Sequence, residues 1–194
     1  MNEQSSRRVL YVVVCAAGPA HEVSRLLTAA RADGWDPYVI TTPEGLRFAD
    51  TEAIERSTGH PVRHAYRSPR EQRSRLPHAS AVIVAPATFN TINKLATGIS
   101  DNYALGVLAE CVGAGVPIVV LPFINSALAA RLPLRKSVES LRAEGIQILL
   151  GDDGHQPHPP GEGSERIPHF PWQAALFAVD RLIEYGPQES RPQR

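Results

Sequence analysis

The sequence predicts an α/β fold, a single-domain Rossmann-like three-layer sandwich with a parallel sheet, and three observations favour it. Short apolar runs alternate with helical stretches along the 194 residues. The runs are continuous rather than alternating in polarity, as is typical of parallel strands buried on both faces. Polar residues gather just behind the runs, where open parallel sheets bind ligands. Strands that alternate with helices indicate a sheet covered on both sides.

The first two predicted strands are residues 8–15, RVLYVVVC, and residues 36–42, DPYVITT. Between them, a helix is expected after Gly18 and Pro19. Its apolar residues repeat at helical spacing and lie on one face. These residues are Val23, Leu26, Leu27 and Ala30.

Two further strands, ASAVIVAP at 79–86 and VPIVVLP at 116–122, enclose a helix pair over residues 90–115. Pro133 suits the first turn of the next helix, whose apolar stripe is Leu134, Val138 and Leu141. GIQILL at 145–150 is expected to close the sheet as a strand. A last amphipathic helix carries Trp172, Leu176, Val179 and Ile183.

Two segments show no periodicity. Residues 151–170 combine Gly, Pro and polar residues and are predicted to form a loop or flap. The tail, residues 186–194, and the polar N-terminus, residues 1–7, are expected to be disordered. We therefore expect one domain over residues 8–185.

Composition and charge exclude several classes of protein. With 43% hydrophobic residues, 21% charged residues and zero formal net charge, the chain carries no electrostatic signal for nucleic acid or an anionic membrane. Its apolar runs are too short to span a bilayer, and the N-terminus does not resemble a signal peptide. Cys15 and Cys111 are isolated, which indicates free thiols and a cytoplasmic location.

Polar or small residues follow four of the predicted strands, as CAAGPA, TTPEG, PATFNT and PFIN. Small residues after the first strand allow close backbone approach, and the hydroxyls of Thr42 and Thr88 can donate to a phosphate. The alternative is that these Thr and Asn residues only cap helices. The GxGxxG fingerprint is absent, which argues against NAD.

Residues 86–102, PATFNTINKLATGISDN, closely resemble the PASANTINKIANGICDN signature of the homo-oligomeric flavin-containing cysteine decarboxylases. This family includes phosphopantothenoylcysteine decarboxylase and the enzymes that decarboxylate the C-terminal cysteine of lantibiotic precursors. The second family signature, PxMNxxMW, is partly present at residues 122–129. Its Pro and Asn are kept, whereas Ile or Leu replaces Met and Ala replaces Trp. The resemblance extends over about residues 8–183.

The resemblance implies FMN as cofactor, a cysteine carboxylate as substrate and a homo-oligomer, a trimer or dodecamer, with no metal. By the same resemblance, Asn90 orients the substrate carboxylate and Asn125 is a second substrate-facing residue. The flavin would oxidise the cysteine while the protein binds and orients it. The implied cofactor-binding residues are Ala16, Ala17, Gly18, Thr42, Phe48, Pro86, Ala87, Thr88 and Asn102.

The catalytic histidine of the family is not found at its expected place, where counting back from Pro86 gives Gln72. Of the nearby histidines, His60, His64 and His78, the last is the candidate base, although a histidine at the start of a strand can also be a solvated polar end.

The flap contains no cysteine, whereas the coenzyme A pathway enzyme uses one there to reduce its enethiol product. A reaction that stops at the enethiol therefore fits better. His155, His158 and His169 lack the ordered spacing of metal ligands and are interpreted as solvated loop residues or substrate contacts. Phe89 occupies a place where the family prefers a small residue, so it would narrow the cysteine pocket or stack on another ligand.

Three functions remain after these considerations, and whether the chain is an enzyme stays open. The first is FMN-dependent oxidative decarboxylation of a cysteine carboxylate, such as a peptide C-terminus, favoured by Asn90 and Asn125. The second is an FMN-binding accessory or regulatory protein, favoured by the missing histidine. The third is the related flavin prenyltransferase, whose Ser-rich phosphate loops are not evident.

Overall fold

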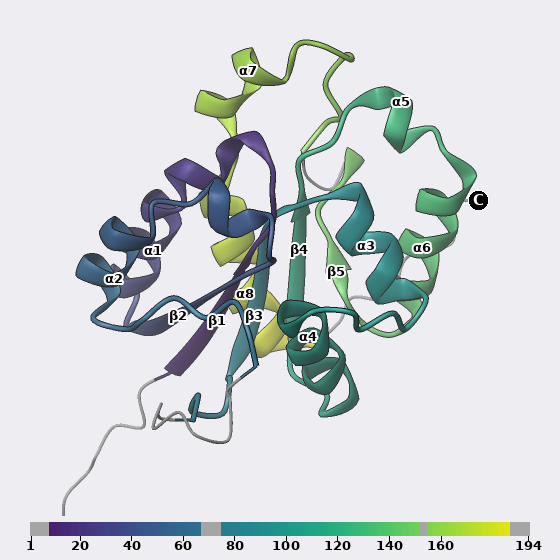
Figure 1. The fold of residues 1–194 in the computed structure, drawn as a ribbon. Coiled ribbons are helices and arrows are strands. Elements are labelled where there is room, and N and C mark those ends of the chain that lie inside the picture. Colours follow the sequence, from purple (N-terminus) through teal and green to yellow (C-terminus); the bar gives the residue numbers. More distant parts are fainter. Residues whose placement is uncertain (1–7, 67–74, 152–154, 187–194) are drawn as a thin grey trace, which may run out of the picture.

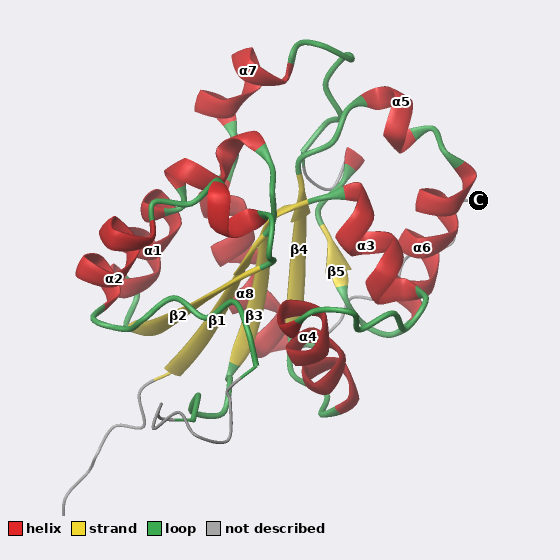
Figure 2. Cartoon of the chain, in the orientation of Figure 1, coloured by secondary structure: helices red, strands yellow, loops and turns green. Residues whose placement is uncertain are grey.

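The computed structural model describes residues 8–66, 75–151 and 155–186. A five-stranded sheet in the order β2-β1-β3-β4-β5 forms its middle layer, and every neighbouring pair is parallel. Helices cover both faces of this sheet (Figures 1 and 2). The predicted α/β three-layer fold is therefore confirmed. The strands are β1 (Arg8–Val14), β2 (Trp35–Thr41), β3 (Ala81–Ala87), β4 (Ile118–Pro122) and β5 (Gln147–Ile148).

The helices are of very different lengths, and the short ones lie in the connections. The longer helices are α1 (Ser24–Ala32), α2 (Thr51–Thr58), α3 (Phe89–Ala96), α4 (Tyr103–Gly113), α6 (Leu132–Ala143) and α8 (Trp172–Tyr185). The short ones are η1 (Gly18–Glu22), η2 (Gly45–Arg47), α5 (Ser126–Ala129), α7 (Gly163–Arg166) and η4 (Ile167–His169).

The residues of β1 alternate between two hydrophobic cores because successive side chains of a strand point to opposite faces. Leu10, Val12 and Val14 pack with α1, α2 and α8 on one face. Val9, Tyr11 and Val13 pack with α3, α4 and α6 on the other. Burial on both faces explains why the strand has a continuous apolar sequence.

The apolar stripes predicted for α1 and α6 are buried as expected. In α8, Ile183 was assigned wrongly to the buried stripe, since it is 42% exposed and its neighbour Leu182 is buried instead. The helix α2 was not predicted, because it buries only Ile54 and Thr58 and so has little apolar periodicity. The residues predicted as the last strand, 145–150, form a strand over only Gln147–Ile148.

The flap is more ordered than its sequence indicated, because it contains α7 and η4 (Figure 1). Residues 152–154 of the flap lie outside the described residues, as does Gln72. Of the two terminal segments predicted to be disordered, residues 1–7 and 186–194, all but Gly186 also lie outside them, and Gly186 follows the last turn of α8. No helix of the described residues is both long and apolar enough to cross a membrane.

Candidate functional site

The carboxyl ends of the parallel strands meet at one edge of the sheet, and backbone hydrogen bonds join the segments that follow them. The N–H of Cys15, after β1, donates to the carbonyl of Pro86 in β3 at 3.1 Å. The N–H of Phe123, after β4, donates to the carbonyl of Ala87 at 2.9 Å. The fold therefore brings most of the predicted site residues to one place.

The segments after β1 and β2 are packed tightly together. The Oγ1 atom of Thr42 accepts the N–H of Gly45 at 3.1 Å, and a Cβ at Gly45 would lie 2.4 Å from the carbonyl oxygen of Val14. The N–H groups of Ala16 and Gly18 donate no backbone hydrogen bond within the described ranges. Two free amides and a nearby hydroxyl form a donor set that suits a phosphate.

Phe48 lies at the end of the same β2 connection and is 46% exposed. Its N–H donates to the carbonyl of Gly45 at 3.0 Å, which ends η2. The aromatic side chain is therefore exposed on the connection after β2, and its place beside a cofactor stays a prediction.

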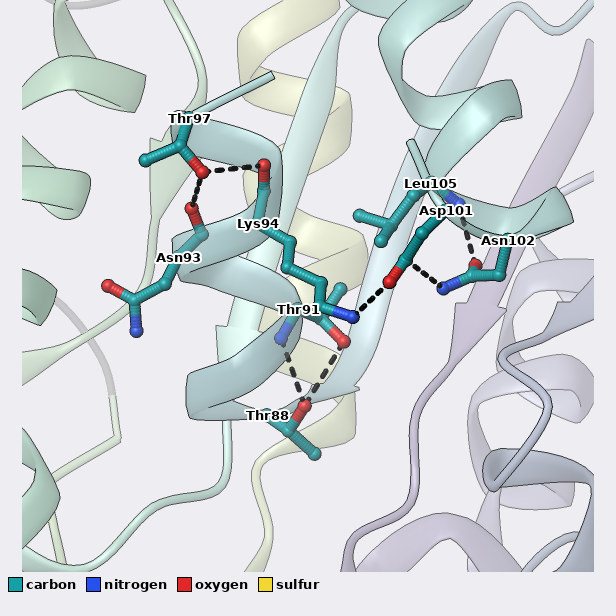
Figure 3. A network of polar contacts seen from close by, with 8 residues as sticks. All are labelled: Thr88, Thr91, Asn93, Lys94, Thr97, Asp101, Asn102 and Leu105. Carbon is teal, nitrogen blue, oxygen red and sulfur yellow. Dashed lines mark hydrogen bonds and ion pairs between the residues drawn. The ribbon is translucent and has the colours of Figure 1, made fainter. Parts of the chain in front are cut away.

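Helix α3 is capped by Thr88, and not by Asn90 as the sequence allowed. The Oγ1 atom of Thr88 accepts the N–H of Thr91 at 3.3 Å and lies 3.1 Å from the Thr91 hydroxyl (Figure 3). Below this cap, burial raises the pKa of the Cys15 thiol, while its hydrogen bonds to Thr91 and Thr88 act in the opposite direction. Burial therefore favours the protonated form of the Cys15 thiol.

The two asparagines of α3, Asn90 and Asn93, have different roles. Asn93 connects helices, since its Nδ2 donates to the carbonyl of Phe89 at 2.7 Å and its Oδ1 accepts the Ser137 hydroxyl of α6 at 2.8 Å. Asn90, in the first turn of α3, is exposed and makes no side-chain hydrogen bond within the part of the chain that the structure describes. Asn90 thus retains all of its side-chain donors and acceptors for a ligand.

Asn102 uses its polar atoms within the protein. Its Oδ1 accepts the N–H of Leu105 at 3.1 Å and caps α4, while its Nδ2 donates to Asp101 at 3.1 Å (Figure 3). Asp101 in turn pairs with Lys94 of α3, and this hydrogen bond holds the pKa of the Asp101 carboxyl below its usual range. The residues at the end of the signature therefore fasten α3 to α4.

Asn125 lies where β4 is followed by α5, and the flap reaches it. Its Oδ1 accepts the N–H of Leu128 at 2.9 Å. The flap residue His158 forms a parallel bridge with Asn125, and the carbonyl of His158 accepts the N–H of Ser126 at 2.8 Å. The flap is thus attached by its backbone to the second substrate-facing position of the family.

Aromatic rings join the flap to the sheet edge. The ring centroid of Phe123 lies 5.7 Å from that of His155, 4.9 Å from that of His158 and 5.6 Å from that of Phe170. Burial, together with His158 and Arg166, lowers the pKa of His155. The Nε2 atom of His155 is buried and has no hydrogen-bond partner within the described ranges.

The flap also covers the segment after β1. A Cβ at Gly18 would lie 2.8 Å from Cδ1 of Ile167 in η4, and Nη1 of Arg25 in α1 donates to the carbonyl of Pro168 at 3.2 Å. Figure 1 shows α7 beyond the end of the sheet at which β1 and β4 terminate. The flap thus contacts both sides of the candidate site.

The structure does not bring His78 to this site. His78 is exposed and precedes the amino end of β3, where the neighbouring Ser80 donates its N–H to the carbonyl of Val9 at 2.8 Å. The length of β3, about 20 Å for seven residues, separates His78 from Asn90. The ring of His60 is engaged elsewhere, with the carboxylate of Asp36 at 2.7 Å.

Two residues of the site were not singled out by the sequence analysis. Phe123 directly follows the Pro122 of the second signature, and its place in that signature was the signal that could have marked it. His158 was named only together with His155 and His169, as solvated loop residues or substrate contacts, because the flap lacks periodicity and nothing in its sequence predicts which residue pairs with Asn125. Among the described residues, His, Cys, Asp and Glu nowhere gather in a group of three or more that could hold a metal ion.

Comparisons with known proteins agree with the fold. A family model described as Flavoprotein matches residues 1–164. The coenzyme A biosynthesis bifunctional protein CoaBC of Escherichia coli K12 is 26% identical over 143 residues, which cover 71% of this chain and 34% of that protein. The chain therefore spans about a third of the length of this curated relative.

Solved structures with similar folds include two decarboxylases. The FMN-dependent cysteine decarboxylase SpaF has a TM-score of 0.64 and 24% identity, covering 88% of this chain and 98% of its own. The cypemycin decarboxylase CypD has a TM-score of 0.67 and 20% identity, covering 96% and 99%. At these identities the likeness establishes the fold.

Proposed function

This chain belongs to the flavoprotein family, and we propose that it binds FMN and oxidatively decarboxylates a cysteine carboxylate, such as a peptide C-terminus, to an enethiol. The observation that carries the proposal is the free side chain of Asn90, exposed at the sheet edge beside the segment Pro86–Thr88. An amide with no partner among the described residues can donate to a carboxylate bound there.

The residues at this edge fit FMN. The free N–H groups of Ala16 and Gly18 and the hydroxyl of Thr42 would hold the phosphate. The small residues Pro86 and Ala87 would lie against the ring system. Bound FMN would accept the electrons released from the cysteine. A single phosphate suits the short connection after β1, which supports FMN over FAD.

Asn90 and Asn125 would bind and orient the substrate. Among the residues that the structure describes, Asn90 offers a free amide, and Asn125 keeps its Nδ2 group free because only its Oδ1 is used for capping. Holding the carboxylate between fixed donors would orient the carbon atoms of the cysteine toward the flavin. The flap would exclude water from the site, because it contacts the segments after both β1 and β4.

The proposal is tested with purified protein. We expect a flavin absorbance spectrum, or its appearance on titration with FMN, with weaker binding of FAD. Incubation with a cysteine-terminated peptide should give a product lighter by CO2 and two hydrogen atoms, detected by mass spectrometry. Protein that takes up neither cofactor contradicts the proposal at its first step.

A second candidate function is an FMN-binding accessory or regulatory protein without turnover. The distance of His78 from Asn90 favours it, because the candidate base of the sequence analysis does not reach the site. This function predicts FMN binding and peptide binding without a change in the mass of the peptide. The same experiment therefore separates the two functions.

We further propose a homo-oligomer, a trimer or an assembly of trimers, as the family resemblance implies. Exposed apolar side chains support this near α4, where Tyr66 is 63% exposed and Ile99 is 46% exposed. The ring of Tyr66 packs on Tyr103 of α4 with a centroid distance of 5.1 Å. Light scattering at micromolar concentration should give a multiple of three chain masses, and a monomer mass refutes the assembly.

A cytoplasmic location is also proposed. Cys15 and Cys111 are both free and buried, and free thiols are typical of proteins in reducing compartments. Fractionation of cells that express the protein should recover it with cytoplasmic markers.

A further inference from the structure

The flap holds the imidazole of His158 next to Asn125. The N–H of His158 donates to the carbonyl of Ile124 at 3.4 Å, and its carbonyl accepts the N–H of Ser126 at 2.8 Å. These bonds form the parallel bridge between His158 and Asn125. Residues paired in this way project their side chains to the same face. The imidazole and the free amide of Asn125 therefore lie on the same face of the paired segments.

The hydrogen bonding of His158 assigns its tautomer. Its Nδ1 lies 2.9 Å from the carbonyl oxygen of Pro159. A carbonyl oxygen can only accept, so the hydrogen of the neutral ring resides on Nδ1. Nε2 is then the lone-pair nitrogen, and it has no hydrogen-bond partner among the residues described. The lone pair of Nε2 can therefore accept a proton from a ligand.

The position of the ring is set by packing as well as by the backbone. The ring is tilted against Phe123 with a centroid distance of 4.9 Å. A Cβ at Gly163 of α7 would lie 3.2 Å from Cε1 of His158, so the absence of a side chain there leaves room for the imidazole. The N–H of Phe123 donates a hydrogen bond to the carbonyl of Ala87. The residue on which His158 packs is therefore joined to the segment proposed to face the flavin.

We propose that His158 is the residue that accepts the thiol proton of a cysteine ligand at this site. The S–H bond breaks, an N–H bond forms at Nε2, and the electron pair stays on sulfur, which gives a thiolate beside an imidazolium. The carboxylate of the same cysteine binds the amide of Asn125. The thiol and the carboxylate of cysteine are attached to adjacent carbon atoms, so they can contact two neighbouring protein groups that lie on the same face. This inference rests on the proposed function and adds a residue to it.

The test uses protein loaded with FMN that is kept reduced, so that a bound cysteine is not oxidised, and two peptides that differ only in a C-terminal Cys or Ser. Calorimetry gives the dissociation constant of each peptide for the parent protein, for His158→Gln and for His169→Gln. His169 is an exposed flap histidine and serves as the matched control. We expect the parent and His169→Gln to prefer the Cys peptide about tenfold, since a charge-assisted contact forms only with the thiol.

His158→Gln is expected to abolish this preference and to keep the affinity for the Ser peptide, which shows that the flap is still in place. The inference is overturned if His158→Gln keeps the preference, or if the parent protein has none. Gly163→Ala provides a second variant that retains the imidazole, and its crowded ring should reduce the preference. The flavin absorbance, recorded for each variant, tests the proposed function separately, because a loaded protein without thiol preference contradicts only the role of His158.

Discussion

The Oγ1 atom of Thr88 accepts the backbone N–H of Thr91 at 3.3 Å, so helix α3 is capped two residues before Asn90. We predict that Thr88→Ala lowers the free energy of unfolding by about 1 kcal/mol, since it leaves the N–H of Thr91 without its partner. Asn90→Ala should change it by less than about 0.5 kcal/mol, because an exposed side chain without partners is removed. Urea unfolding of the two variants checks this order, and an equal loss contradicts the capping assignment.

Asn90→Asp tests the ligand role of this residue. The variant should fold as well as the parent protein, because a carboxylate in the first turn of α3 is favourable. It should also keep its FMN. We expect it to bind a cysteine-terminated peptide at least about tenfold more weakly, since it replaces an amide donor by a second negative charge. Calorimetry measures this loss, and parental affinity would mean that the substrate carboxylate lies elsewhere.

Gly45→Ala tests the contact between the segments after β1 and β2. The added Cβ would lie 2.4 Å from the carbonyl oxygen of Val14, a backbone atom that moves only if the segments separate. We expect a loss of about 1–3 kcal/mol in the free energy of unfolding and weaker FMN binding, because Thr42 moves with its segment. Fluorescence titration with FMN and urea unfolding measure the two effects.

The matched control for Gly45→Ala is Gly113→Ala at the end of α4, where an added Cβ meets no atom within 4 Å. This substitution should leave FMN binding unchanged and stabilise the protein by up to about 1 kcal/mol. Equal FMN affinity in the two variants would show that the contact between the segments is not needed for the cofactor.

The lowered pKa of His155 predicts a dependence of stability on pH. Burial favours its neutral form in the folded protein, so the unfolded chain binds more protons below the ordinary imidazole pKa of about 6.5. Stability contributed by this residue is therefore present above that pH and is lost as the pH falls toward the lowered pKa of the folded state. His155→Phe should reduce this loss, whereas His169→Gln should not. Thermal unfolding between neutral and mildly acidic pH measures this loss of stability. Identical pH profiles for the parent protein and His155→Phe would contradict its attribution to His155.

The order of the strands along the chain, the longer helices other than α2, and the edge that carries the candidate site could be predicted from the sequence. Continuous apolar runs and helical stripes are local patterns, so Leu134, Val138 and Leu141 identified the buried face of α6 directly. All strands of a parallel sheet run in the same direction, so the edge at which their carboxyl ends meet follows from the chain direction alone. The signature over residues 86–102 likewise indicated the family without any coordinates.

Only the tertiary structure decided which polar side chains are free. Asn90 and Asn93 are three residues apart and of the same type, yet one is exposed and the other joins α3 to α6 through Ser137. In the same way, His78 was near the site in sequence but lies at the opposite end of β3, whereas His158 is distant in sequence but pairs with Asn125. A hydrogen-bonding side chain is available to a ligand only where no neighbour satisfies it, and those neighbours come from segments that the fold brings together and that local sequence patterns do not specify.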